Sequence, residues 1–214
     1  MRLNDKYAVI TGGAGGIGLA SARRFLDEGA AGVMLVDLDE EALKAAASSL
    51  ESDRVEWCAA DVGSSEAVRD YTSAVIARFD RIDVLFLNAG IEGVVKPLDE
   101  YPEDMYDKVL NVNVKGVWLG LRHAFPYMKK QGGGSVIITS SVAGLGGTPG
   151  IMAYVTSKHA IIGSMRVAAL EGARHAADVV VGGLEAVQRE VEVDGELGAI
   201  LEQLAHHLDH RISQ

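Results

Sequence analysis

Tyr154 and Lys158 are the two residues of this sequence whose types and spacing most directly suggest acid–base chemistry. Four residues advance a helix by about 6 Å and return to nearly the same face, so both side chains can point into one cleft. A free tyrosine has a pKa near ~10, too high for easy proton exchange at neutral pH. A neighbouring ammonium group favours the phenolate, so the pair predicts a tyrosine that acts as an acid or a base. The alternative is a surface lysine beside a packed tyrosine.

A glycine-rich segment over residues 11–18 (T-G-G-A-G-G-I-G) follows an apolar run and opens a segment of helical periodicity. Glycines let the backbone approach a pyrophosphate, and a helix N-terminus offers it unpaired N–H groups. Glycines also make ordinary turns, but the position between a strand and a helix favours a dinucleotide site. A P-loop is excluded because no Lys-Ser/Thr pair follows the glycines.

Asp37 stands at the end of the second apolar run, about twenty residues past the glycines. A carboxylate at this place can accept hydrogen bonds from both hydroxyls of an adenosine ribose and would repel a 2′-phosphate. The simpler reading is a helix-capping aspartate. With no arginine beside it, Asp37 favours NAD over NADP.

The elements that must position these residues alternate between strands and helices, which predicts an α/β fold with a Rossmann-type, doubly wound parallel sheet. We expect a single domain over residues 1–214, with an atypical C-terminal segment over 176–214. The expected strands cover residues 7–11, 32–37, 55–60, 82–87 and 135–140, with 179–183 as a candidate sixth strand. Long helices are expected over 105–130 and 153–175, and a final helix over 196–210.

The spacing T-G-x-x-x-G-I-G resembles the short-chain dehydrogenase/reductase family, and further matches follow in order along residues 1–175. They are Asp61-Val62 after the third strand and Asn88-Ala89-Gly90 after the fourth. The resemblance implies that Asp61 contacts the adenine amino group, that Val62 contacts its ring, and that residues 88–90 support the cofactor cleft. The implied cofactor-binding residues are Gly12, Gly16, Ile17, Gly18, Asp37, Asp61, Val62, Asn88, Ala89, Gly90, Tyr154 and Lys158.

The resemblance also implies two further catalytic residues. Ser141, thirteen residues before Tyr154, would be the substrate-orienting serine, with Ser140 as the neighbouring alternative. Asn113 matches the family's fourth catalytic position, where an asparagine carries a water-mediated proton path from the lysine to solvent. Asn111 lies two residues away, but the spacing to Gly116 selects Asn113; the alternative is an asparagine that only kinks the helix.

Together these residues imply an NAD-dependent alcohol dehydrogenase or ketone reductase that moves a hydride between a secondary alcohol or ketone and the cofactor. Tyr154 would exchange the hydroxyl proton, and Lys158 would lower the tyrosine pKa and hold the nicotinamide ribose. Ser141 would fix the carbonyl oxygen.

The C-terminal part departs from the family's pattern. Family members follow the sixth helix with a strand that ends in Pro-Gly, a substrate lid and a last strand, whereas Pro149 is the last proline here. A shortened natural variant, a frameshifted end and an engineered replacement would each give this pattern. The competing function is therefore a dinucleotide-binding protein with little turnover, because the lid region is missing.

Composition narrows the partners to a small molecule. A formal charge of -10 argues against a nucleic-acid partner, because phosphate recognition rests on clustered lysine and arginine. The single cysteine, Cys58, the charged N-terminus and the lack of a ~20-residue apolar run predict a cytoplasmic protein without membrane contact. The histidines lack metal-ligand spacing, so we expect no metal.

The resemblance implies a homodimer through the two long helices, with a homotetramer as the alternative. The final helix should pack its leucine stripe on the body or the partner.

Overall fold

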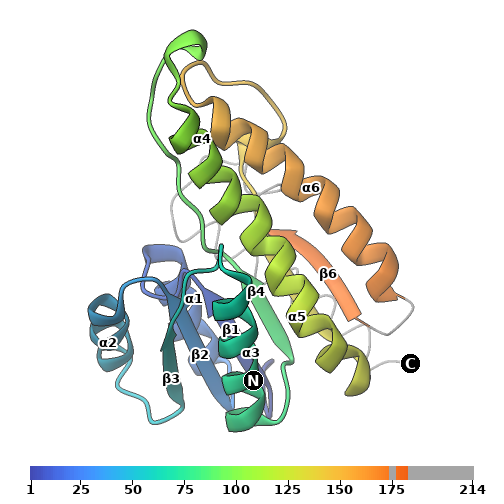
Figure 1. Ribbon diagram of the computed structural model, residues 1–214. Helices are drawn as coiled ribbons and strands as arrows, with labels where there is room; N and C mark the ends of the chain where they lie inside the picture. The colour runs from blue at the N-terminus through green and yellow to red at the C-terminus, as the bar shows by residue number, and fades with distance from the viewer. Residues whose placement is uncertain (174–176, 183–214) are drawn as a thin grey trace.

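A six-stranded parallel sheet forms the centre of the molecule in the computed structural model, which describes residues 1–173 and 177–182 (Figure 1). The strand order is β3-β2-β1-β4-β5-β6, so the direction of winding reverses between β1 and β4. This confirms the predicted doubly wound sheet, and the candidate sixth strand pairs in parallel with β5. The strands are β1 (Tyr7–Thr11), β2 (Gly32–Asp37), β3 (Val55–Ala59), β4 (Val84–Leu87), β5 (Gly134–Thr139) and β6 (Ala177–Gly182).

Helices cover both faces of the sheet because the central strands are apolar on both sides. On one face, α1 (Gly16–Asp27) and α2 (Glu40–Ser49) bury a core that includes Phe25, Leu35 and Leu43. On the other, α3 (Ser65–Phe79), α5 (Gly116–Lys130) and α6 (Met152–Ala173) bury a core that includes Val75, Leu119 and Ile161. Each large side chain buried in this way stabilises the fold by roughly 1.5–3 kcal/mol.

The helix expected over residues 105–130 runs from residue 103 to 130 and contains a π-helical turn that the sequence prediction did not include. It consists of α4 (Glu103–Leu110), a π-helical segment η2 (Asn111–Lys115) and α5. The π-helical turn, which is wider than an α-helical one, contains Asn113. The side chain of Asn113 is buried against the loop after β4. Such π-turns occur frequently at functional sites.

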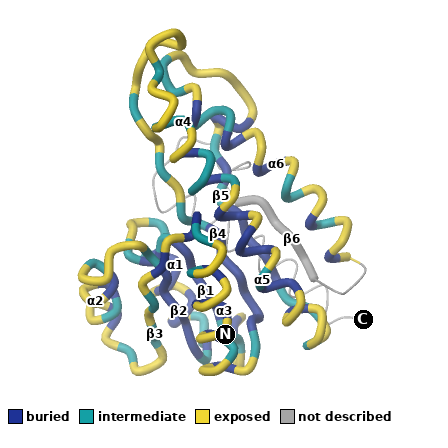
Figure 2. The backbone as a smooth tube through the Cα atoms, viewed as in Figure 1, coloured by how far each residue is buried: buried dark blue, intermediate teal, exposed yellow. Residues whose placement is uncertain are grey.

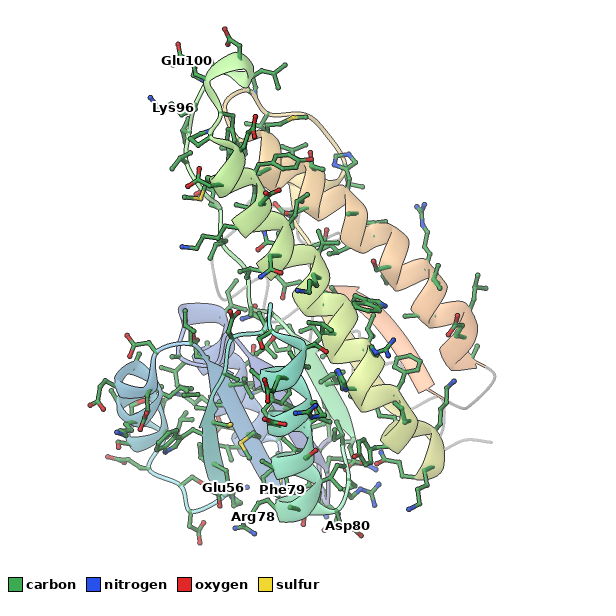
Figure 3. The ribbon with its side chains drawn as sticks, viewed as in Figure 1. Glu56, Arg78, Phe79, Asp80, Lys96 and Glu100 are labelled. Atoms are coloured by element: carbon green, nitrogen blue, oxygen red, sulfur yellow. The ribbon has the colours of Figure 1, made fainter. Side chains whose placement is uncertain are left out.

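Two loops extend beyond the carboxyl ends of the strands and form a lobe (Figure 1). The first runs from residue 91 to α4 and contains the short helix η1 (Leu98–Glu100), and the second joins η3 (Val142–Gly144) to α6. They meet where the Lys96 amide donates to the Gly150 carbonyl at 2.9 Å. Most residues of the two loops are exposed (Figure 2). Lys96 and Glu100 lie at the tip of the lobe (Figure 3). The opposite end of the molecule carries Glu56, Arg78, Phe79 and Asp80.

The final helix expected over 196–210 lies outside the described residues.

Candidate active site

A cleft of about 940 Å³ crosses the carboxyl ends of the strands, from the β2–β3 side to β5. It therefore passes the point between β1 and β4 where the winding reverses, which is where doubly wound sheets bind ligands. Twelve of the predicted site residues line it, whereas Gly18 and Asn113 do not. The twelve are Gly12, Gly16, Ile17, Asp37, Asp61, Val62, Asn88, Ala89, Gly90, Ser141, Tyr154 and Lys158.

The glycine-rich loop has a shape that only glycines allow at two positions. Gly12 has φ +67°, which disfavours other residues, and a Cβ on Gly18 would run into the Gly12 carbonyl oxygen. Gly16, in contrast, has open space where a Cβ would stand and faces the cleft. Gly18 thus sets the close packing of α1 under the loop, and Gly16 leaves room above it.

The N-terminus of α1 fits a bound pyrophosphate. Neither a side-chain cap nor an acidic residue occupies its first turn, whereas Asp39 caps α2 and Ser64 caps α3. Its first N–H groups therefore have no side-chain acceptor at the edge of the cleft, and the helix dipole favours an anion there. The residues present consequently fit a dinucleotide cofactor.

Two carboxylates flank the β2–β3 end of the cleft. Asp37 accepts hydrogen bonds from the backbone amides of Ala14 at 3.1 Å and Leu38 at 2.8 Å, which fix its side chain beside the glycine-rich loop. Asp61 accepts from the Gly63 amide at 2.8 Å. Both carboxylates are thus held by the backbone at places where they line the cleft.

A chain of hydrogen bonds joins the glycine-rich loop to Lys158. The Asn88 side-chain amide donates to the Gly12 carbonyl at 3.4 Å, and its oxygen accepts from the Thr139 hydroxyl at 3.0 Å. The Thr139 carbonyl in turn accepts from Lys158 Nζ at 2.9 Å. On β1, the buried Thr11 hydroxyl accepts from the amides of residues 88 and 89, which orients this loop toward the cleft.

Lys158 is buried beneath Tyr154. Its Nζ lies 5.4 Å from the centre of the Tyr154 ring, and only 5% of its surface is exposed. Burial disfavours the charged form and lowers the pKa of Lys158 to about 8. The helical spacing therefore does bring the phenol and the amine into one cleft, as the sequence predicted.

Asn113 lies behind the cleft with its whole side-chain amide in use. Its Oδ1 accepts from the Ile91 amide at 2.8 Å, while its Nδ2 donates to the Ile91 carbonyl at 2.8 Å and to Ser157 Oγ at 3.0 Å. Ser157 is fully buried and donates to the Tyr154 carbonyl at 2.7 Å. Asn113 thus ties the loop after β4 to the start of α6. Asn111 instead accepts from Lys115 and lies against Gly63.

The two adjacent serines differ in their surroundings. Ser141 lines the cleft, and its oxygen accepts from the Ala143 amide at 3.2 Å, so its hydroxyl proton is free to point outward. Ser140 is buried and donates to the Lys158 carbonyl at 3.4 Å. Of the two, Ser141 has the geometry to meet a substrate.

The family model described as short chain dehydrogenase matches residues 6–192. The chain belongs to the short-chain dehydrogenase family. The matched segment extends beyond residue 175, where the recognised motifs end, and it includes every residue that lines the cleft.

Individual relatives support the same assignment. The chain is 39% identical to levodione reductase of Leifsonia aquatica and to the uncharacterized oxidoreductase YxjF of Bacillus subtilis, covering 81% of this chain and 66% and 67% of theirs. The solved structure of NAD+-bound xylitol dehydrogenase superposes with a TM-score of 0.82 at 36% identity, over 86% of this chain and 72% of that one. The chain thus spans about two thirds of the length of the curated relatives. The relatives named above are reductases or dehydrogenases or carry the name oxidoreductase.

Sequence reasoning missed Thr139 and Ser157 as parts of the site and named Thr11 only as the first residue of the glycine-rich motif. Ser157 directly precedes Lys158 and Thr139 lies two residues before Ser141, and these positions are the only signals that the sequence offered. Within the described residues, no cluster of metal-ligating side chains occurs, and no helix is long and apolar enough to cross a bilayer.

Proposed function

We propose that this short-chain dehydrogenase transfers a hydride between NAD(H) and a secondary alcohol or ketone. The observation that carries the proposal is the position of Lys158 Nζ, 5.4 Å from the centre of the Tyr154 ring. Both residues line the same cleft as the glycine-rich loop, and helix α1 after this loop has no side-chain cap. An acid–base pair thus shares one cleft with a site that suits a pyrophosphate. A bound nicotinamide cofactor supplies the hydride acceptor or donor.

The chain's own residues handle the proton and the orientation. The Tyr154 hydroxyl takes the proton of the substrate alcohol or returns it to the carbonyl oxygen. When charged, the Lys158 ammonium favours the phenolate form of its neighbour. The Ser141 hydroxyl donates to the substrate oxygen, where charge develops during the reaction.

Asn113 contributes by positioning, because its side-chain amide is occupied by Ile91 and Ser157. It holds the loop that follows Gly90 and the first turn of α6 in a fixed relation. A water-mediated proton path from Lys158 past Asn113 to solvent stays a prediction of the family resemblance.

NAD is the cofactor that the cleft favours. The carboxylate of Asp37 is held at the end of β2 by two backbone amides, so a 2′-phosphate would meet a fixed negative charge. The relative whose solved structure contains NAD+ is consistent with this choice. One relative is named for levodione and another for xylitol, so their names select no single substrate.

For assembly we propose a cytoplasmic homodimer formed through α5 and α6, with a homotetramer as the alternative. A groove of about 610 Å³ lies between these helices, and Trp118 and Val167 line it while about half exposed. Large exposed apolar side chains in one groove suit a protein interface.

Titrations and turnover assays test the proposed function together. NADH should bind more tightly than NADPH at fixed salt, and Asp37→Ala should narrow the difference. A panel of secondary alcohols with NAD+ should give NADH. Equal affinities for the two cofactors would contradict the assignment of NAD. NADH binding without turnover of any alcohol would favour the competing function, a dinucleotide-binding protein with little turnover.

A further inference from the structure

The reacting end of the cleft is bounded by the segment that connects Ser141 to Tyr154. In the proposed reaction both residues face the substrate oxygen. The side chains between them that line the cleft therefore border the rest of the substrate. Those that line the cleft are Val142, Ala143, Thr148 and Ile151, and Ile91 lines it from the loop after β4. Four of these five side chains are hydrocarbon.

Apolar side chains continue outward from this wall onto the lobe. Val142, Leu145 and Met152 are 54%, 57% and 42% exposed, although each is large and apolar. Val95 joins them from the facing loop, with its Cγ1 2.9 Å from where a Cβ on Gly150 would stand. Exposed apolar side chains at the rim of a pocket are typical of a ligand-binding groove.

Within the part of the chain that the structure describes, the charged side chains at this end of the cleft balance in sign. Beyond the cofactor-side aspartates and Lys158, the charged residues that line the cleft are Glu92 and Lys108, one of each sign, and both are exposed. Neither forms an ion pair or a side-chain hydrogen bond within the described part of the chain. Arginine, the side chain that binds carboxylates with two parallel bonds, does not line the described cleft.

We propose that the substrates are secondary alcohols and ketones that carry hydrocarbon groups on both sides of the reacting carbon, in preference to polyols and hydroxy acids. The inference rests on the proposed function and deepens it. In the oxidation direction the carbinol C–H bond breaks and its hydride reduces NAD+ to NADH, while the hydroxyl proton passes to Tyr154. A polyol would place hydroxyl groups against the Ile91, Val142 and Ile151 side chains, which offer no hydrogen bond in exchange for the water that these hydroxyls lose.

Matched substrates test this inference. Cyclohexanol and myo-inositol have the same ring, and 2-butanol and 3-hydroxybutyrate have the same chain length. We expect kcat/KM to be at least about tenfold higher for the hydrocarbon member of each pair, the discrimination that small changes in an apolar pocket produce. Equal or higher kcat/KM for myo-inositol or 3-hydroxybutyrate would overturn the inference. Turnover of any member that Tyr154→Phe abolishes would still support the proposed function.

Binding keeps the test independent of turnover. Saturation-transfer NMR on the protein–NADH complex should show contacts to cyclohexanone and weaker or no contacts to myo-inositol. The reverse order would overturn the inference even if the chain turned over neither compound.

A matched pair of variants locates the effect. Val142→Ser should lower the ratio of kcat/KM for cyclohexanol over myo-inositol, or the corresponding ratio of affinities, by about tenfold and leave NADH affinity unchanged. Leu98→Ser is the control, because Leu98 lies in the other short helix of the lobe, is 73% exposed and does not line the cleft. An unchanged ratio in Val142→Ser, or an equal loss in Leu98→Ser, would overturn the assignment of this wall.

Discussion

Lys158 Nζ donates to the backbone carbonyl of Thr139, and the hydroxyl of the same Thr139 donates to Asn88. One residue at the end of β5 thus links the lysine of the acid–base pair to the loop that contacts Gly12. The two halves of the cleft, which lie on opposite sides of the winding reversal, are held in a fixed relation by this link.

Replacing Thr139 tests whether this link supports cofactor binding. Thr139→Val keeps the shape of the side chain but leaves Asn88 Oδ1 without its donor. Because one such bond contributes about 1 kcal/mol, NADH affinity should fall about fivefold in a fluorescence titration. Thr139→Ser retains the hydroxyl and should bind NADH nearly as the wild type does. A Thr139→Val protein with unchanged affinity would show that the link has no part in binding.

The buried Lys158 should make the cofactor-free protein more stable at alkaline pH. Its pKa is about 8 in the folded chain against an ordinary value of 10.5, so the unfolded chain binds more protons between these values. The free energy of unfolding should therefore rise with pH across this window, by about 3 kcal/mol from this group.

The matched measurement is urea denaturation of the wild type and Lys158→Met at a series of pH values. Subtracting the two curves removes the titration of other groups, including the buried Tyr71. A difference that stays flat between pH 8 and 10.5, or falls, would contradict the burial of an amine with a lowered pKa.

Two glycines of the same helix should respond oppositely to alanine. Gly18→Ala should lower the free energy of unfolding by more than about 1 kcal/mol, because its Cβ would collide with the Gly12 carbonyl. Gly16→Ala has open space and should be neutral or stabilising, as alanine favours a helix by up to ~1 kcal/mol. Thermal and urea unfolding of both variants measure this. Equal effects would show that the loop does not pack as described.

The proposed dimer can be tested at the groove between α5 and α6. Val167→Glu would place a charge in the interface, so light scattering should shift from a dimer in the wild type to a monomer. Leu145→Glu is the control, since Leu145 has the same 57% exposure and lies in the lobe. A wild type that is already monomeric at micromolar concentration would contradict the dimer.

Local patterns explain why much of the fold could be predicted. Strands such as β2 and the glycine-rich loop have their signals in adjacent residues, and the spacing from Tyr154 to Lys158 is a property of one helix. The choice of Asn113 over Asn111 rested on the spacing to Gly116, and that of Ser141 over Ser140 on the family resemblance; the catalytic roles of both residues stay predictions.

Contacts between distant residues explain what was missed. The role of Thr139 depends on Asn88, 51 residues earlier in the chain, and that of Ser157 depends on Asn113, 44 residues earlier. Asn113 lies within the π-turn and bonds to Ile91, 22 residues earlier, a contact that only the folded loop provides. Helical periodicity therefore predicted the helix but not its π-turn.

Formation of NADH from NAD+ and a secondary alcohol, compared between the wild type and Tyr154→Phe, tests the proposed function most directly. The variant removes only the phenolic hydroxyl, so it should bind NADH with nearly wild-type affinity while its turnover is almost abolished. Ala153→Gly, one residue away and outside the cleft lining, shows the effect of a merely local change at the start of α6. Turnover in the wild type that disappears in Tyr154→Phe with NADH binding intact is the predicted result. A Tyr154→Phe enzyme with near-normal kcat would contradict the proposed role of the Tyr154–Lys158 pair.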